Sequence, residues 1–261
     1  MSGTTPTLAT VVFNADDLGR TAGINAGIFA AHRAGLVTSA TMMVGFPAAR
    51  LAARELAAHP ALGVGLHVTL TGAEPTLPAV RVPTLVDAAG RLARKPENLV
   101  APDPGELLAE VRNQLAIFHA LVGRAPTHLD SHHHSHRHPA VLAAVLAVAR
   151  EHRLPVRRSS EAIAEALSRN GLATTDRFVE RFFGAEATLA VLLAILRDAA
   201  ATGGTTEVMC HPGHPDAELR AESGYADDRE REIAVLSDPA ALALAEELGL
   251  RRLPFDQACA S

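Results

Sequence analysis

Aromatic side chains and thiols are scarce in this chain of 261 residues, and each scarcity narrows the class of protein. The chain has eight Phe, one Tyr and no Trp, which argues against the stacking platforms that bind single-stranded nucleic acid. The two cysteines, Cys210 and Cys259, are too few for a disulfide framework. The formal net charge of -5 gives no basic surface for nucleic acid or for an acidic membrane.

Long apolar runs and a leader peptide are also missing. The opening segment MSGTTPTLATVVFNADD has neither a charged start nor a long apolar stretch, so we expect no secretory signal. No segment reaches the roughly 20 apolar residues of a membrane helix. We therefore expect a soluble cytoplasmic protein without an integral membrane segment, with a core that the 48% hydrophobic content can fill.

Short apolar, β-branched runs alternate with longer segments of helical spacing. Strands are expected at 8–15, 36–44, 62–70, 126–132, 154–159 and 205–213, and helices at 22–35, 48–59, 104–123, 139–152, 186–203 and 238–249. Such alternation indicates parallel βαβ units. We predict one α/β domain over residues 1–261, a distorted TIM-like (β/α) barrel, with a doubly wound open sheet as the alternative. The irregular stretch 71–102 has a length that is often functional.

Polar side chains gather where four of the predicted strands end, in the sequences NADD, LHVT, HLDSHHH and CHPG. Because the carboxyl ends of parallel strands meet on one face, we expect these side chains to share one site. Strand alternation turns His67 to the interior and places Asp130 and His132 on one face. Asp16 and Asp17 would point in opposite directions, so both reach the site only if their strand ends there.

The segment THLDSHHHSHRH, residues 127–138, holds six histidines in twelve positions. Such a tract can be a solvated metal-scavenging segment, and the pair in NADD can be a helix cap. The tract lies between a predicted strand and a strong helix, which favours one or two of its histidines as ligands of a single metal. Strand alternation turns His133 away from the site, and His136 and His138 lie toward the helix start, so these three are expected to be dispensable for the chemistry.

One carboxylate and two neutral imidazoles form an open metal site with room for water and a substrate oxygen. A second carboxylate can take a proton from that water, and a separate histidine can protonate a leaving group. The chain lacks a Walker loop, a dinucleotide glycine fingerprint and a G-x-S-x-G elbow. Metal-dependent hydrolysis is therefore favoured. A non-catalytic metal- or sugar-binding barrel and a metal-dependent phosphoesterase are the alternatives.

Five motifs in this order, NADDLG, VTSATMMV, VGLHVTLTG, PTHLDSHHHSH and EVMCHPG, resemble those of the YdjC-like carbohydrate deacetylases. That family includes chitooligosaccharide deacetylases and a branch linked to hopanoid biosynthesis, and the resemblance spans residues 9–232. It implies a distorted (β/α) barrel that removes the N-acetyl group of an amino sugar, or of an N-acetylated glycan or glycolipid. The sequence does not choose between the two branches.

The resemblance also implies roles for individual residues. Asp17, His67 and His132 would hold a divalent metal, Mg²⁺ or Zn²⁺, with Asp16 as general base and His211 as acid. The residues expected to contact substrate or to support these groups are Asp130, His134, Arg157 and Tyr225. Asp130 would orient a ligand histidine, and either Arg157 or Arg158 would keep Asp16 ionised. The expected partner is a small N-acetylated sugar, and a homodimer is a candidate assembly.

Overall fold

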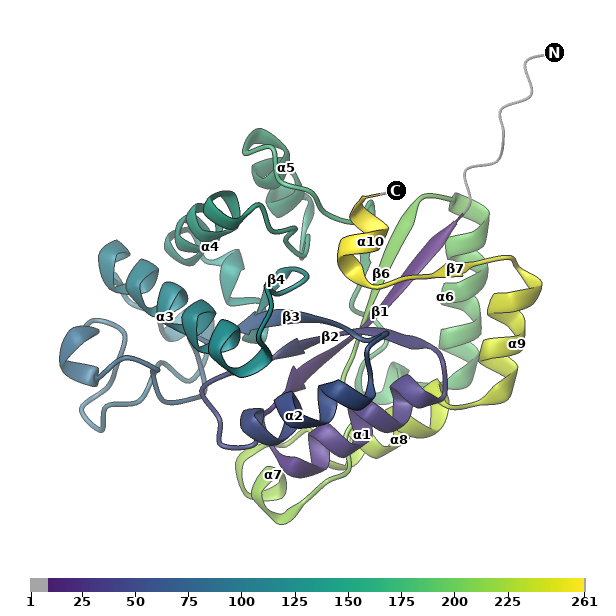
Figure 1. The fold of residues 1–261 in the computed structure, drawn as a ribbon, viewed down its shortest axis with the longest axis horizontal. Helices are drawn as coiled ribbons and strands as arrows, with labels where there is room; N and C mark the ends of the chain where they lie inside the picture. The colour runs from purple at the N-terminus through teal and green to yellow at the C-terminus, as the bar shows by residue number, and fades with distance from the viewer. Residues whose placement is uncertain (1–8, 261) are drawn as a thin grey trace.

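A computed structural model describes residues 9–260 and contains a curved, seven-stranded parallel sheet with helices around it (Figure 1). The strands are β1 (Thr10–Leu18), β2 (Val37–Met42), β3 (Gly63–Val68), β4 (Leu129–Ser131), β5 (Arg177–Val179), β6 (Thr205–Cys210) and β7 (Arg251–Arg252). Their order is β4-β3-β2-β1-β6-β5, and β7 pairs with the first residues of β1. The polar carboxyl ends of β1, β3, β4 and β6 therefore belong to strands that are near neighbours in one sheet.

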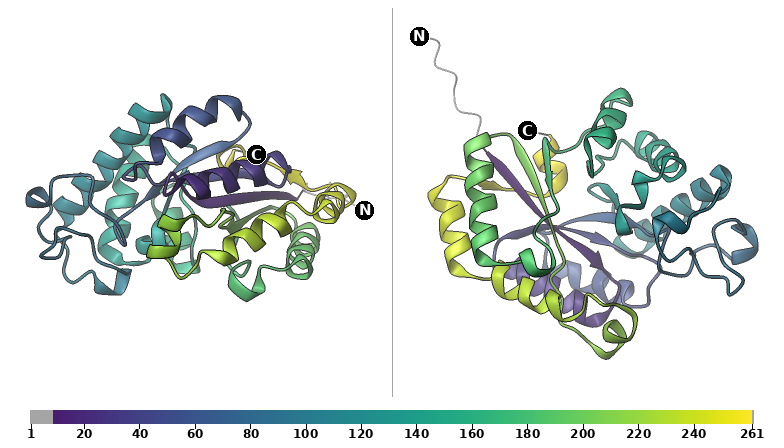
Figure 2. Two further views of the ribbon diagram at one scale, coloured as in Figure 1. Left: turned by 90° about the horizontal axis from the view of Figure 1, so that it is seen from below. Right: turned by 180° about the vertical axis from the view of Figure 1, so that it is seen from behind.

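Helices connect these strands and wrap around the sheet, as the two further views in Figure 2 show. The α-helices are α1 (Ala22–Arg33), α2 (Ala49–Glu55), α3 (Pro104–Val122), α4 (Pro139–His152), α5 (Glu161–Arg169), α6 (Leu189–Thr202), α7 (Ala217–Glu222), α8 (Asp227–Leu236), α9 (Pro239–Glu247) and α10 (Phe255–Cys259). The 3₁₀ helices are η1 (Leu56–Ala58), η2 (Ala79–Arg81), η3 (Pro96–Asn98), η4 (His132–Arg137) and η5 (Gly184–Glu186). Thr21, Asp103 and Thr188 start α1, α3 and α6, because their side-chain oxygens accept hydrogen bonds from the first-turn N–H groups.

The parallel α/β architecture predicted from the alternation is confirmed, and the sheet forms an open arc. The strand expected at 154–159 is reduced to a single bridge between Leu129 and Val156. Residues 160–184, which showed no clear pattern, form α5 and β5. Leu8, the first residue of the predicted strand 8–15, lies outside the described residues. Within residues 9–260, no helix combines the length and the apolar character needed to cross a membrane.

The C-terminal segment fills the interior of the arc at the amino ends of the strands. A Cβ on Gly63 would lie 2.7 Å from the Pro254 side chain, and one on Gly65 would lie 2.6 Å from the His128 ring. His128 in turn stacks on Phe255 of α10, with ring centroids 4.0 Å apart. The two glycines therefore face inward, as strand alternation predicted for β3, and leave room for these rings. With this end closed, the carboxyl ends of the strands remain as the open face.

Candidate active site and metal centre

Two adjacent aspartates reach one cavity because β1 loses its regular alternation at its carboxyl end. Asp17 has a φ of +72°, in the left-handed region that non-glycine residues rarely adopt. The pairing of β1 with β2 shifts register between Ala15 and Leu18. As a result Asp16 and Asp17 are both buried and both line a cavity of about 1580 Å³. The sequence analysis expected both side chains to reach one site only if the strand ended at NADD. Strand β1 instead continues to Leu18, and the irregular backbone at Asp17 has the same effect.

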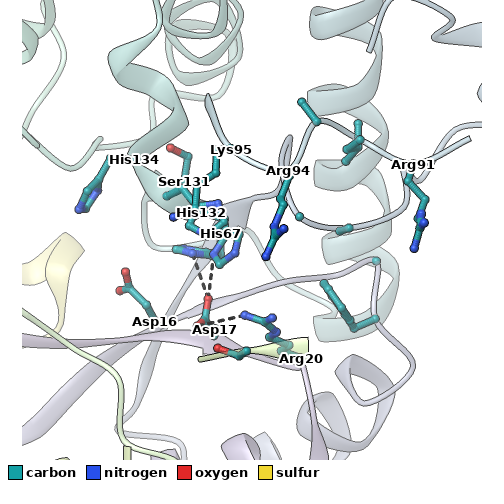
Figure 3. Close-up of a pocket in the computed structure, with 18 of the residues that line it drawn as sticks. Asp16, Asp17, Arg20, His67, Arg91, Arg94, Lys95, Ser131, His132 and His134 are labelled. Carbon is teal, nitrogen blue, oxygen red and sulfur yellow. Dashed lines mark ion pairs between the residues drawn. The ribbon is translucent and has the colours of Figure 1, made fainter. Parts of the chain in front are cut away.

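Asp17, His67 and His132 bring one donor atom each to a common point (Figure 3). Asp17 Oδ1 lies 3.4 Å from His67 Nε2 and 3.2 Å from His132 Nδ1. Among the described residues, Asp17 Oδ1 and His67 Nε2 have no hydrogen-bond partner although both atoms are buried. Such orphaned atoms are costly unless a ligand joins them. One carboxylate and two imidazoles suit a divalent metal ion, so the residues present fit the expected metal.

Asp130 holds His67 from the side opposite this common point. His67 Nδ1 donates to Asp130 Oδ1 at 2.7 Å, and Thr41 donates to Asp130 Oδ2 at 3.0 Å. Burial lowers the pKa of His67, but the carboxylates of Asp130, Asp17 and Asp16 outweigh burial and raise it to about 10. Because the Nδ1 proton is committed to a carboxylate, Nε2 is the nitrogen that would give up its proton to a metal. Asp130 thus lies where the sequence expected a residue that orients a ligand histidine.

A buried arginine, Arg157, forms a salt bridge with the candidate base Asp16. Its Nη1 and Nη2 each donate to one Asp16 oxygen at 2.7 Å, and Asn14 donates to Asp16 Oδ1 at 2.9 Å. Burial raises the pKa of Asp16, but Arg157 outweighs burial and holds that pKa well below its usual value. Arg157 also contacts Asp130 Oδ2 at 2.9 Å and Glu207 Oε1 at 2.7 Å. One cation therefore links the candidate base to Asp130, the support of His67. Of the two arginines expected near Asp16, Arg157 contacts it and Arg158 pairs with Glu161 instead.

His211, the candidate acid, follows β6 and is held by Glu232. His211 Nε2 lies 4.0 Å from Asp16 Oδ2, and its Nδ1 lies 3.9 Å from Glu232 Oε1. The backbone N–H of His211 donates to Glu232 Oε2, and the Tyr225 hydroxyl donates to Oε1 at 2.5 Å. Burial lowers the pKa of His211 to about 4 and raises that of Glu232 to about 7. The imidazole of His211 is therefore neutral near pH 7.

Helix α8 adds two residues that the sequence analysis did not single out. Arg229 donates to Asp17 Oδ2 at 2.5 Å, and its Nε donates to the Tyr225 carbonyl at 3.0 Å. Glu232 holds His211, as described above. Arg229 and Glu232 have the i, i+3 spacing that places side chains on one helical face, and Tyr225 lies just before the helix begins. That spacing was the available signal, but no helix was predicted for residues 214–237, so it was not used.

The histidine-rich segment leaves strand geometry at His132. Strand β4 ends at Ser131, and η4 has positive φ angles at His133 and His134. His133 therefore lines the cavity, with Nδ1 3.0 Å from Thr71 Oγ1, and the expectation that alternation turns it away from the site is wrong. The expectation fails because the alternation of a strand no longer applies after Ser131. His134 also lines the cavity, as expected for a residue near the substrate.

His136 is a packing residue in this segment. It is buried, and its two ring nitrogens lie 2.5 Å from Ser131 Oγ and 2.7 Å from Ser159 Oγ. Burial lowers the pKa of His136 to about 3, so the ring is neutral over most of the pH range. It does not line the cavity.

The irregular stretch 71–102 forms a wall of the cavity. Several basic side chains extend from this wall and from the end of β1 toward the cavity (Figure 3). They are Arg91, Arg94, Lys95 and Arg20. These cations come from the long loop and from the residue after Gly19.

This chain is similar to several known proteins in sequence and in fold. The family model for YdjC-like proteins matches residues 10–247. A carbohydrate deacetylase of Geobacillus stearothermophilus is 40% identical over 244 residues, which cover 94% of this chain and 96% of the relative. A chitooligosaccharide deacetylase of Yersinia pestis (strain Pestoides F) is 36% identical over 234 residues, which cover 88% and 91%. A crystal structure from Enterococcus faecalis V583, named as a candidate cellobiose-phosphate cleavage protein, superposes with a TM-score of 0.91 at 30% identity, covering 97% of this chain and all of that one. The chain belongs to the YdjC-like family, as its five motifs predicted.

Proposed function

We propose that this protein is a metal-dependent hydrolase that removes the N-acetyl group from an acetylated amino sugar, with its site on the open face of a distorted (β/α) barrel. One observation carries the proposal: an ionised carboxylate, Asp16, lies beside the donor cluster of Asp17, His67 and His132 in one cavity. A protein that only binds a metal or a sugar has no use for a second carboxylate there. The names of the two deacetylase relatives supply the substrate class.

The metal would be held by Asp17 Oδ1, His67 Nε2 and His132 Nδ1. Two imidazoles beside one carboxylate favour Zn²⁺, because Mg²⁺ prefers sites made of oxygen atoms. When bound, such an ion polarises the acetamide carbonyl and makes a bound water more acidic. Arg229 contributes from outside this set: by occupying Asp17 Oδ2, it leaves Oδ1 as the oxygen that faces the two imidazoles.

Asp16 and His211 would move one proton from the attacking water to the departing amine. Arg157 keeps Asp16 ionised, so this carboxylate is ready to accept the proton. His211 has a lowered pKa and starts without a proton to give. Because its Nε2 lies 4.0 Å from Asp16 Oδ2, a proton taken by Asp16 can pass to His211 and from there to the nitrogen as the amide bond breaks. Acetate and a free amino sugar are the products.

The test is acetate release from a panel of N-acetylated mono- and oligosaccharides, with the free amine measured in parallel. Protein stripped of metal by a chelator should release no acetate, and added Zn²⁺ or Mg²⁺ should restore release. Equal amounts of acetate and amine identify hydrolysis of the amide. A metal-loaded protein that releases acetate from no N-acetylated sugar contradicts the proposal.

A metal-dependent phosphoesterase is the second candidate, and the basic side chains of the loop wall favour it. Arg91, Arg94 and Lys95 line the cavity and would suit a phosphate group. Asp16 argues for the deacetylase, since a negative base held beside the metal repels an anionic reacting group. Assay of the same metal-loaded protein with p-nitrophenyl phosphate separates the two: phosphate release without acetate release supports the second candidate.

A further inference from the structure

Two of the few aromatic residues in the chain stand together at the cavity. Tyr225, the single tyrosine of the sequence, stacks on Phe183 with ring centroids 4.1 Å apart and planes 9° from parallel. Both rings line the cavity that contains the metal-binding cluster. Phe183 is 43% exposed, whereas its neighbour Phe182 is fully buried. Of these two consecutive phenylalanines, Phe182 therefore packs in the core and Phe183 is exposed at the cavity.

The exposed ring is held in place by its surroundings. The Gly184 N–H donates to the Tyr225 hydroxyl at 2.8 Å, and the Gly184 carbonyl accepts from Arg231 at 3.2 Å. Phe182 anchors the preceding residue in the core. Phe183 is thus held by its two chain neighbours, Phe182 and Gly184, and by the Tyr225 ring that stacks on one of its faces. An aromatic ring held in this way loses little conformational freedom when a ligand binds to it.

The stacked pair lies beside the candidate acid. The His211 ring centroid is 5.3 Å from that of Phe183 and 5.7 Å from that of Tyr225, with the imidazole plane steeply inclined to both. Nearly equal distances to two parallel rings place His211 at the edge of the stack and not over a face. Tyr225 covers one face of Phe183, so the opposite face is the one left for a ligand.

We propose that the free face of Phe183 is the platform on which the substrate's pyranose ring stacks, an inference that rests on the proposed deacetylase function. The departing amine must come within about 3 Å of His211 Nε2. The sugar ring that carries this nitrogen then falls within reach of the neighbouring Phe183 face. The C–H groups on one side of a pyranose pack against an aromatic ring, which would turn the acetamide toward Asp16 and the metal donors. Phe183 would therefore select sugar amides over acyclic ones.

The test compares Phe183→Ala and Phe183→Trp with a matched control, Leu51→Ala. Leu51 is also an exposed large apolar residue, 52% exposed, but it lies on α2 and does not line the cavity. KM and kcat are measured for acetate release from N-acetylglucosamine and its oligomers, and calorimetry gives the Kd of the deacetylated sugar. Phe183→Ala should raise KM and Kd about tenfold, the scale of one lost stacking contact, with kcat changed by less than about threefold. Phe183→Trp should restore both, and Leu51→Ala should match the unmodified protein.

The outcomes separate this inference from the proposed function. Unchanged KM and Kd in Phe183→Ala overturn the platform, as does a loss that Phe183→Trp fails to rescue. Unmodified protein that binds the amino sugar but releases no acetate contradicts the deacetylase, and the Kd series then decides on the platform alone. Failure of the metal-loaded protein to bind any of these sugars overturns the platform directly.

Discussion

Arg157 holds both carboxylate oxygens of Asp16, with Nη1–Oδ2 and Nη2–Oδ1 distances of 2.7 Å each. The guanidinium is fully buried and also reaches Asp130 and Glu207, so three carboxylates share one cation. Such a fork fixes the orientation of Asp16 as well as its charge. The side chain that would accept the water proton is therefore positioned by a buried residue that does not itself line the cavity.

Replacing Arg157 with lysine should weaken the base without removing the positive charge. A lysine cannot make the two parallel hydrogen bonds, and the pKa of Asp16 should rise because this partner holds it low. Asp16 is active when ionised, so activity should be lost at a higher pH as the medium is acidified. We expect kcat to fall by about 10²-fold. A pH–rate profile checks this, and Arg158→Lys is the control because Arg158 pairs with the exposed Glu161 and not with Asp16. An acid limb at an unchanged pH contradicts the role of Arg157.

Acid should destabilise the fold through His128, whose pKa is lowered to about 3 by burial. In the unfolded chain a histidine titrates near pH 6.5. Between these values the unfolded state binds a proton that the folded state does not, so the free energy of unfolding falls as pH decreases, by about 1.4 kcal/mol per unit for this residue. His128→Phe keeps a ring against Phe255 and removes the titration. Urea denaturation at stepped pH should show a shallower decline in this variant, and an identical decline would reject the assignment.

Metal affinity should depend on Arg229, which touches Asp17 and no other member of the donor cluster. Arg229→Met removes the partner of Asp17 Oδ2 while keeping an unbranched side chain in the same space. The carboxylate then loses its fixed orientation, and the Kd for Zn²⁺ should rise by about 10- to 100-fold. Competition with a fluorescent chelator measures this directly. Arg231→Met, an exposed position on the same helix, is the control and should bind metal as the unmodified protein does.

The parallel sheet could be predicted from the sequence alone, because alternating apolar runs and helices form a local pattern. The carboxyl ends of parallel strands lie on one face, so the same pattern predicted that four strand ends meet there. His67 and Asp130 could be assigned by alternation because β3 and β4 are regular where these residues stand.

Strand alternation could not predict local irregularities of the backbone or contacts between residues far apart in the sequence. The left-handed Asp17 and the turn into η4 after Ser131 break the period from which side-chain direction is deduced, which is why His133 was placed wrongly. Arg229 and Glu232 reach the site from a helix near the end of the chain. Arg229 and Asp17 are 212 residues apart, and a contact over such a separation leaves no local sequence pattern. The bond between Glu207 and Arg157 joins residues 50 positions apart, so no local pattern predicts it either.

The separation of roles between two adjacent carboxylates is the centre of this account, and metal content measured together with turnover in Asp16→Asn and Asp17→Asn tests it most directly. Asp16→Asn should keep metal content near that of the unmodified protein while turnover falls by about 10²- to 10⁴-fold, because the amide cannot accept the water proton. Asp17→Asn should lose metal, and excess Zn²⁺ should restore part of the activity. Loss of metal from Asp16→Asn with retention in Asp17→Asn, or full turnover in both, would contradict the account.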